Sequence, residues 1–148
     1  MSGEQLKERL HGMLLYAPAL NYVYPYYQTH LNKLPKDLRQ RLENGGAIDH
    51  WDALGSALMK KDFAEDSRQY EVDLNKPVNI KCPVRIMHGL QDTEISFKQT
   101  LDLCQSIVSN DVDLIIRKNG PHQLEQPMDI EIFLNTLDRM LKDHPVRS

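Results

Sequence analysis

The sequence predicts an α/β fold with about three parallel strands. Three apolar runs have the length of a strand, at residues 12–17, 84–88 and 114–118, and the second and third are rich in β-branched residues. Helical patterns lie between these runs and after the last one, so the expected order along the chain is β-α-α-β-α-β-α. Helices that alternate with apolar strands favour a parallel sheet with right-handed crossover connections.

Composition limits the classes of protein to which the chain can belong. Its 148 residues suit one domain, and a net charge of −3 with a pI near 6.0 offers no basic surface for nucleic acid. No apolar run approaches the roughly 18 residues that a membrane span needs. Cys82 and Cys104 show no C-x-x-C or metal-ligand spacing, so we expect free thiols of an intracellular, reducing compartment.

The first apolar run begins abruptly. Residues 4–9 have the pattern of the last turns of a helix, and they lead without a loop signal into the run at 12–17. A parallel strand that is buried on both faces is normally entered from an earlier strand and helix. We therefore interpret residues 1–148 as a partial domain that starts within its fold, with the sheet and its packing helices in 1–17 and 81–148.

Residues 18–80 have a different pattern, which we interpret as a cap or lid insertion followed by a linker. Tyrosines cluster at its start, and a helix follows with leucines at fourfold spacing, Pro35 in its first turn and two glycines at its end. A second helix is expected from about Ala57 to Tyr70, with Ser56 as its cap. Two helices without strands of their own, inserted between sheet strands, are typical of a lid; ordinary surface helices are the alternative. The leucines are Leu34, Leu38 and Leu42, and the tyrosines are Tyr22, Tyr24, Tyr26 and Tyr27.

Two amphipathic helices follow the second and third strands. Ser96 and Gln99 form a capping box ahead of a helix that we expect to run to Val108. Pro127 opens the last helix. The apolar face expected to pack in the first of these helices consists of Phe97, Leu101, Cys104 and Val108, and that of the last helix consists of Ile130, Leu134, Leu137 and Leu141.

An acidic and a basic side chain follow two of the strands. Asp92 lies on the turn after the central strand, and His122 lies in the loop after the third strand. Because α/β proteins place ligands and chemistry at the carboxyl edge of the sheet, we expect the two side chains to meet there. An aspartate that accepts a hydrogen bond from one imidazole nitrogen leaves the other nitrogen free as a general base, as in Ser-His-Asp catalysis. The alternative is that Asp92 caps a turn and His122 is an ordinary loop histidine.

Two further side chains near this edge have other interpretations. Glu94 is an alternative acid, although a solvated surface carboxylate is its expected role. His88 could join Asp92 and His122 as a metal ligand, but H-x-x-x-D on a strand and turn lacks the fixed helical geometry of H-E-x-x-H sites, so we expect no metal. The glycines form neither G-x-G-x-x-G nor G-x-x-x-x-G-K, so no nucleotide cofactor is expected.

The segments CPVRIMHGLQD and DVDLIIRKNGPH, with the helices that follow them, resemble the C-terminal half of the α/β-hydrolase fold over residues 81–141. More narrowly, they are similar to the branch that contains mitochondrial palmitoyl-protein thioesterases and acyl-glucuronide esterases. The resemblance implies that Asp92 is the acid and His122 the base of a catalytic triad, and that residues 12–17 are the strand after the nucleophile helix. It also implies a mitochondrial location and a small-molecule or acylated-protein substrate.

The resemblance implies a nucleophile that this sequence lacks. The family's serine lies in a G-x-S-x-G turn between a strand and a helix, and no such motif occurs in the 148 residues. Ser56, in A-L-G-S-A-L, has glycine on one side only and follows the first strand, so we do not assign it as the nucleophile. Pro121 is a second departure, because the family usually has a non-proline residue before the histidine, and proline fixes φ and removes an N–H.

The sequence therefore predicts the acid-base part of a serine hydrolase that cleaves acyl esters or thioesters, S-depalmitoylation included, with the nucleophile in a missing N-terminal half. The 148 residues alone are expected to be inactive. The alternative is a non-catalytic protein that keeps this part of the fold and binds an apolar ligand or a partner along the unpaired edge of its first strand.

Overall fold

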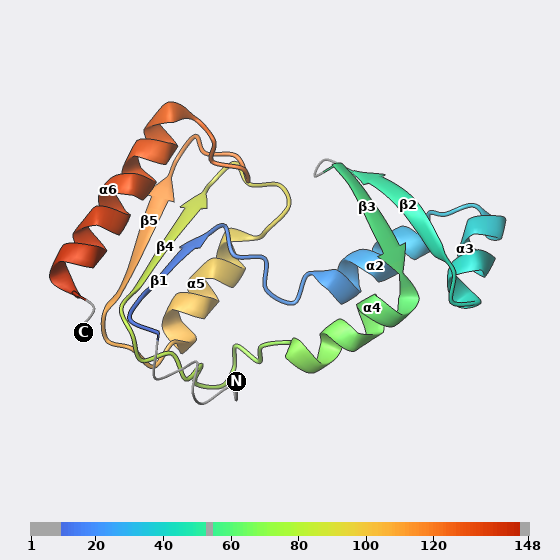
Figure 1. The fold of residues 1–148 in the computed structure, drawn as a ribbon, viewed down its shortest axis with the longest axis horizontal. Coiled ribbons are helices and arrows are strands. Elements are labelled where there is room, and N and C mark those ends of the chain that lie inside the picture. Colours follow the sequence, from blue (N-terminus) through green and yellow to red (C-terminus); the bar gives the residue numbers. More distant parts are fainter. Residues whose placement is uncertain (1–9, 53–54, 146–148) are drawn as a thin grey trace. The chain divides into compact units, whose positions relative to one another are not determined.

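The chain folds into two compact units. The computed structural model describes residues 10–52 and 55–145, so the helical turns expected at 4–9 lie outside the described residues. One unit combines the residues before 20 with those after 72, and the other is Leu20–Val72 (Figure 1). Among the described residues, no helix is long and apolar enough to cross a membrane.

The first unit is built on a three-stranded parallel sheet. Its strands are β1 (Met13–Tyr16), β4 (Val84–Gly89) and β5 (Val112–Arg117), in the order β1-β4-β5. Both pairings are parallel, with Ile86 of β4 opposite Leu15 on one side and Leu114 on the other. The predicted α/β class and the three parallel strands are confirmed, and β4 occupies the centre because its residues are apolar enough to be buried on both faces.

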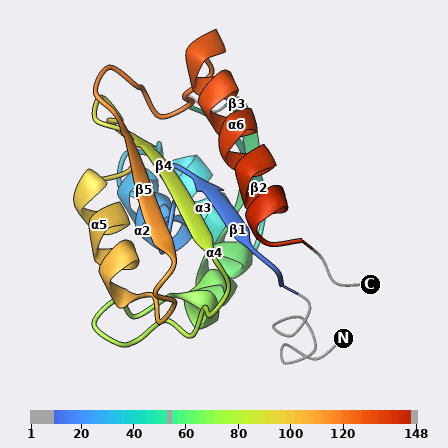
Figure 2. The same cartoon turned by 90° about the vertical axis from the view of Figure 1, so that its left-hand side faces the viewer.

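Two helices cover the sheet. Figure 2 shows α5 (Phe97–Ser106) on one face and α6 (Pro127–Asp143) on the other, with the strands between them. The central strand contributes most of the fully buried side chains of this unit, and the helices add Thr100 and Asp129. The arrangement places the turns after β4 and β5 at the same edge of the sheet.

The buried face of α5 differs from the predicted one. Thr100 and Leu103 are buried, whereas Leu101 is 40% exposed and Val108, which lies beyond the end of the helix, is 46% exposed. The packing face is thus rotated by one residue from the predicted stripe. Ser96 does occupy the N-cap position, but its side chain makes no capping hydrogen bond, so the predicted capping box is wrong in that detail.

The buried face of α6 also differs from the prediction. All four leucine and isoleucine residues of the predicted stripe are exposed, by 36% to 58%. The helix instead packs through Asp129 and Met140, which are buried, and through residues at helical spacing between them. The prediction failed because the row that meets the sheet includes the polar residues Asp129 and Thr136, so it is less regularly apolar than the exposed row. The partly buried residues are Ile132, Phe133 and Thr136.

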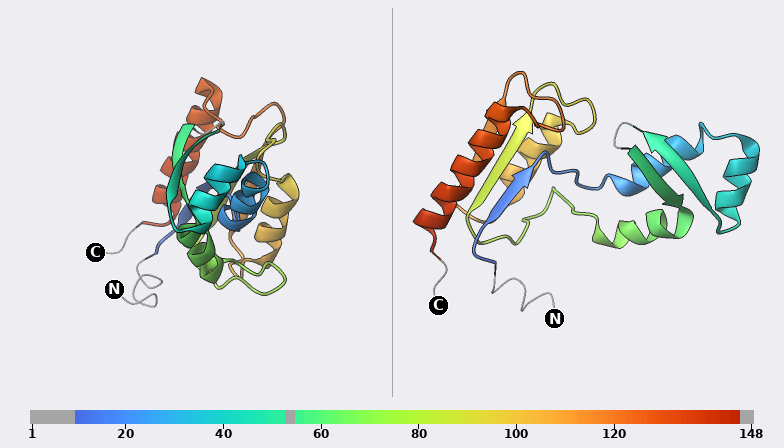
Figure 3. Two further views of the ribbon diagram at one scale, coloured as in Figure 1. Left: turned by 90° about the vertical axis from the view of Figure 1, so that its right-hand side faces the viewer. Right: turned by 45° about the horizontal axis from the view of Figure 1, so that its top comes forward.

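The second unit contains strands that the sequence analysis did not predict. Its elements are α2 (Val23–Leu31), α3 (Lys36–Glu43), β2 (Ala47–Asp52), β3 (Gly55–Lys60), α4 (Lys61–Ser67) and the 3-10 turn η1 (Arg68–Tyr70). Strands β2 and β3 pair antiparallel as a hairpin, which Figure 3 shows beside α2.

The expected helix from Ala57 to Tyr70 is therefore wrong in its first part. Ser56 lies on β3 opposite Trp51 and caps no helix, and helical structure begins only at Lys61. Short apolar runs such as A-L-M suit a strand or a buried helix equally well, and here the cross-strand partner decides. The tyrosine cluster, conversely, lies mainly on the unpredicted helix α2. The leucine helix is confirmed as α3 for Leu38 and Leu42, but Leu34 precedes it and Pro35 is its N-cap instead of a residue of its first turn.

The second unit has its own hydrophobic core, and hydrogen bonds join its first and last residues. Residues from all its main elements form one buried cluster, which consists of Tyr27, Leu42, Ile48, Met59 and Ala64. At its two ends, the Asn21 side chain donates to the carbonyl of Val72 (2.8 Å) and accepts from the N–H of the same residue (2.7 Å). This amide clasp holds the entry and exit of the unit together. The interpretation of the unit as a lid stays a prediction.

Residues 73–80, expected as a linker, pack with the sheet unit. The N–H of Val78 donates to the carbonyl of Ser106 (2.8 Å), and the N–H groups of Val108 and Ser109 donate to the carbonyls of Val78 and Ile80. The linker is therefore tied to the end of α5 before the chain enters β4.

Candidate active site

Asp92 is held by the turn that leads from β4 to α5. Its N–H donates to the carbonyl of Gly89 (3.1 Å), which closes the turn directly after the strand. Its Oδ1 atom accepts hydrogen bonds from the N–H groups of Glu94 and Ile95, both at 2.8 Å. The side chain is fully buried. A short sequence after the strand thus fixes the position and the rotation of this carboxylate.

The His122 loop is tied to the Asp92 turn through the backbone. Beyond the paired ends of β4 and β5, the N–H of Leu90 donates to the carbonyl of Arg117, and the N–H of Gln91 donates to the carbonyl of Gly120, both at 2.9 Å. These bonds extend the parallel pairing past the strands. The two loops therefore form one unit at the carboxyl edge of the sheet.

Two glycines allow the loops to approach this closely. A Cβ atom on Gly89 would overlap the carbonyl oxygen of Gly120, and a Cβ atom on Gly120 would lie 3.1 Å from the Cα of Gly89 and 2.8 Å from the Cβ of Arg117. Glycine is required at both positions because backbone and neighbouring Cβ atoms cannot move aside as the end of a long side chain can.

The two side chains paired by the sequence analysis lie in contact. His122 Nδ1 is 2.8 Å from Asp92 Oδ2, the carboxylate is fully buried, and the imidazole is 18% exposed. When Nδ1–H donates to the carboxylate, Nε2 carries the lone pair and is the nitrogen able to accept a proton. Pro121 does not prevent this contact. The catalytic roles of the two residues stay a prediction.

The surroundings of Asp92 keep it ionised. Burial raises the pKa of this carboxyl, but the hydrogen bonds from the Ile95 N–H, the His122 ring and the Glu94 N–H together outweigh burial, and the net pKa is lowered. The site therefore holds a buried anion next to an imidazole, which is the arrangement that stabilises an imidazolium when the ring takes up a proton.

Three residues that the sequence analysis missed, Arg117, Asp129 and Tyr16, support the two ends of the loop that carries His122. Arg117, at the end of β5, pairs with Asp129, at the start of α6, with 2.5 Å between Nε and Oδ1, and the Asp129 side chain is 1% exposed. The hydroxyl of Tyr16 on β1 donates to the carbonyl of Leu124, which is buried at a φ of 44°. Asp129 could have been noticed in the sequence, because it lies at helical spacing with the residues of α6 that are buried.

Glu94 lies on the other side of the imidazole. Its Oε2 atom is 3.9 Å from His122 Nε2, its Oε1 atom accepts a long hydrogen bond from Gln123 (3.4 Å), and its side chain is 20% exposed. Glu94 is therefore partly exposed, and it faces the nitrogen that Asp92 leaves open. Asp92, not Glu94, is the carboxylate that holds Nδ1.

His88 lies behind Asp92. Its ring is fully buried, Nδ1 is 2.8 Å from the hydroxyl oxygen of Thr100, and Nε2 is 3.7 Å from Asp92 Oδ2. Burial lowers the pKa of His88, against opposing effects from Asp92 and the backbone of Ile95. In the part of the chain that the structure describes, no group of three or more His, Cys, Asp or Glu side chains is arranged to hold a metal ion.

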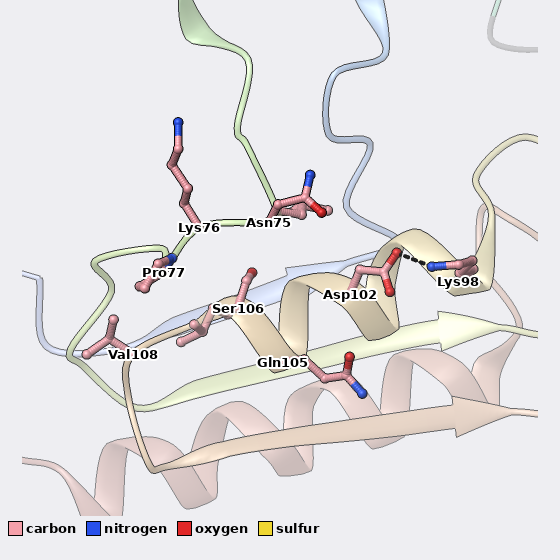
Figure 4. A pocket seen from close by; sticks show the side chains of 10 residues that line it. Asn75, Lys76, Pro77, Lys98, Asp102, Gln105, Ser106 and Val108 are labelled. Atoms are coloured by element: carbon pink, nitrogen blue, oxygen red, sulfur yellow. Dashed lines mark hydrogen bonds and ion pairs between the residues drawn. The ribbon is translucent and has the colours of Figure 1, made fainter.

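A separate groove of about 550 Å³ lies along α5 and the segment at 74–77 (Figure 4). Its polar wall includes Lys98, whose Nζ atom lies 2.6 Å from Asp102 Oδ2 in an exposed ion pair one helical turn apart. Neither Asp92 nor His122 lines it. An exposed pair of this kind is a solvated feature of the helix surface and supplies no chemistry of its own.

The chain is similar in sequence to curated thioesterases, while no protein-family model matches it. Bovine palmitoyl-protein thioesterase ABHD10, mitochondrial, is 29% identical over 116 residues, which are 76% of this chain and 38% of that protein. The mouse protein of the same name is 37% identical over 68 residues, or 46% of this chain and 23% of the relative. The human protein is 25% identical over 116 residues, again 76% and 38%. The chain thus spans about two fifths of the length of these relatives.

Solved structures give the same fold. Mouse alpha/beta hydrolase domain-containing protein 10 matches with a TM-score of 0.72 at 24% identity, over 95% of this chain and 56% of that chain. A putative hydrolase from Agrobacterium vitis matches with a TM-score of 0.73 at 25% identity, over 93% and 54%. The chain therefore has the architecture of the C-terminal half of the α/β-hydrolase fold, and its relatives in sequence include mitochondrial ABHD10 palmitoyl-protein thioesterases.

Proposed function

We propose that this chain supplies the acid and the base of a serine hydrolase that cleaves acyl esters or thioesters. The observation that carries the proposal is the 2.8 Å contact between His122 Nδ1 and a fully buried Asp92 carboxylate, at the edge of the sheet where both strands end. The other oxygen of that carboxylate is occupied by two backbone N–H groups. The carboxylate is thus held through Oδ1 and accepts the hydrogen bond of the His122 ring through Oδ2.

The roles follow from the geometry. Asp92 holds the ring of His122 in the tautomer whose Nε2 is unprotonated and stabilises the positive charge that forms on the ring. Nε2 takes the proton of a serine hydroxyl as that oxygen attacks the acyl carbon, and then returns it to the departing alcohol or thiol. Water repeats the sequence to release the acid.

The nucleophile and the oxyanion hole would come from outside these 148 residues, because the sequence holds no G-x-S-x-G. The names of the relatives suggest the substrate class that we propose. It is a long-chain acyl thioester on a protein cysteine, in mitochondria. Removal of S-linked acyl groups from protein cysteines is therefore the first form of the reaction to assay.

A serine-directed fluorophosphonate tests the proposal. The 148-residue chain should not be labelled and should show no burst with an activated ester, whereas a longer protein that adds an in-frame G-x-S-x-G should show both. His122→Ala in the longer protein should abolish the burst. If the 148-residue chain is itself labelled and Ser56→Ala removes the label, the assignment of an external nucleophile is wrong.

A second candidate function is binding without catalysis. Strand β1 lies at an edge of the sheet, and α6 exposes Leu134 and Leu141 by more than half. An unpaired strand edge and an apolar helix face are both surfaces that bind other chains. A natural transcript that starts at Met1, with no upstream exon encoding the serine motif, would favour this function over hydrolysis.

A further inference from the structure

A second imidazole lies behind the carboxylate of the candidate triad. His88 is the last residue but one of β4, and its ring is fully buried between the strand and α5, with the ring of Phe97 edge-on at 5.6 Å. Thr100, also fully buried, places its hydroxyl oxygen 2.8 Å from His88 Nδ1. Nothing in the mechanism described above uses either side chain.

The protonation state of His88 follows from these contacts. Burial lowers its pKa, so the ring is neutral near pH 7 and has one N–H donor and one acceptor nitrogen. The ring nitrogen Nε2 makes no hydrogen bond of normal geometry and lies 3.7 Å from the Asp92 Oδ2 atom. A lone pair on Nε2 would face an anion, whereas an N–H would be attracted to it. The favoured tautomer therefore has its proton on Nε2, and the Thr100 hydroxyl donates to Nδ1.

We propose that His88 is a positioning residue for Asp92, with Thr100 holding it in the tautomer that directs its Nε2–H toward Oδ2. The same oxygen accepts the hydrogen bond of His122, so it lies between two imidazoles, one at 2.8 Å and one at 3.7 Å. At 3.7 Å the inner contact is electrostatic and not a hydrogen bond. In a buried setting such a dipole still restrains the carboxylate and stabilises its charge.

In this arrangement, the two oxygens of the Asp92 carboxylate have different partners. Oδ1 is held by the turn after β4, through the N–H groups of Glu94 and Ile95. Oδ2 is shared between His122 on the solvent side and His88 on the core side. The titratable groups that face the Asp92 carboxylate are His88 and His122, and Glu94 in turn lies near His122 Nε2. The consequence for catalysis rests on the proposed function; the tautomer and its effect on Asp92 do not.

Nuclear magnetic resonance tests the inference without any assay of activity. Histidine-selective ¹⁵N labelling, in the chain or in a longer protein that includes it, should show His88 as the neutral Nε2–H tautomer at pH 7.5. Observation of the Nδ1–H tautomer would overturn the proposal, and this measurement needs no variant.

Two variants then test the effect on Asp92. Thr100→Val removes the hydroxyl at nearly constant volume, and His88→Phe removes both ring nitrogens; each should raise the pKa of Asp92, followed by ¹³C shifts of its carboxyl carbon. Thr100→Ser keeps the hydroxyl and should restore the wild-type titration. An unchanged Asp92 titration in both variants would contradict the positioning role.

In the longer protein, Thr100→Val should reduce kcat by about tenfold with little change in KM, as loss of an outer hydrogen-bonding partner does. Ser106→Ala, on the same helix, is the matched control and should leave kcat unchanged. If the spectroscopic results are as expected but the longer protein hydrolyses no acyl ester or thioester, the proposed function fails and the positioning role of His88 stands.

Discussion

Two histidine–aspartate contacts lie at opposite ends of the same sheet. At the carboxyl edge, His122 Nδ1 is 2.8 Å from Asp92, whose side chain is fully buried. At the amino edge, His144, which caps the end of α6, places Nε2 3.2 Å from Asp111, whose side chain is 42% exposed. The residue types match and the distances differ by only 0.4 Å (3.2 against 2.8).

The difference lies in what else surrounds each carboxylate. Asp111 also binds Arg85 at 2.7 Å, so its charge is already neutralised, and water screens the rest. In the described part of the chain, no arginine pairs with Asp92; it accepts hydrogen bonds from two backbone N–H groups, and its side chain is buried away from water. His122 is therefore the neighbour that can take up a positive charge beside it. Burial and the other hydrogen bonds, not the pair itself, separate a candidate catalytic contact from a surface contact.

The largest expected difference between the two ends concerns activity. In a longer protein that includes the serine motif, Asp92→Asn should reduce kcat on the order of 10⁴-fold with a small change in KM, because the carboxylate acts mainly in the transition state. Steady-state hydrolysis of an activated thioester measures this. Asp111→Asn is the matched control and should retain the wild-type rate; an equal loss in both variants would remove the distinction between the two contacts.

The ion pairs next to each contact should differ in their effect on stability. Asp129→Ala leaves Arg117 without its buried partner and should lower the free energy of unfolding by about 3 kcal/mol. Asp113→Ala removes an exposed partner of Arg85 at the amino edge and should change it by less than about 0.5 kcal/mol. Urea unfolding followed by circular dichroism compares them, and a similar loss in both would mean that burial does not set the strength of these pairs.

Acid should affect the carboxyl edge through Asp92 itself. The pKa of Asp92 is lowered in the folded protein from the usual 3.8, because its hydrogen bonds outweigh its burial. Below 3.8 the unfolded chain binds the proton first, so the stability that Asp92 contributes is fully present above that value and is lost as pH falls through the folded pKa. The free energy of unfolding of wild type and Asp92→Asn should therefore converge as pH is lowered. A gap that stays constant down to acid unfolding would contradict the lowered pKa.

The smallest effect on stability is expected on α6, which joins the two ends. Leu134→Lys and Leu141→Lys lie on the exposed stripe and should change the free energy of unfolding by less than about 0.5 kcal/mol while reducing self-association of the 148-residue chain. Sedimentation velocity over a range of concentrations measures the association. Phe133→Ala, on the half-buried face beside Tyr16, is the destabilising control. A wild-type chain that stays monomeric and melts sharply would show that the stripe and the β1 edge do not drive association.

Several features of the chain could be predicted from local pattern. Strand ends are marked by breakers such as Gly89, and the turns after two neighbouring parallel strands lie at one edge of the sheet. Asp92 and His122, which lie on these turns, could therefore be paired from the sequence. The α/β class and most of the leucine helix α3 followed in the same way, because residue spacing is a property of a single segment.

Other features depend on partners that are distant in the sequence. Whether A-L-M forms a strand or a helix depended on its pairing with β2, and the faces of α5 and α6 were set by Thr100 meeting His88 and Asp129 meeting Arg117. For β4 and β5, the sequence alone indicated to within one residue where the strand ends and which side chains follow it, since these are local properties. Only the tertiary structure decided which stripe of each helix is buried, because a buried polar group requires a particular partner, and that requirement outweighs a nearby row of leucines.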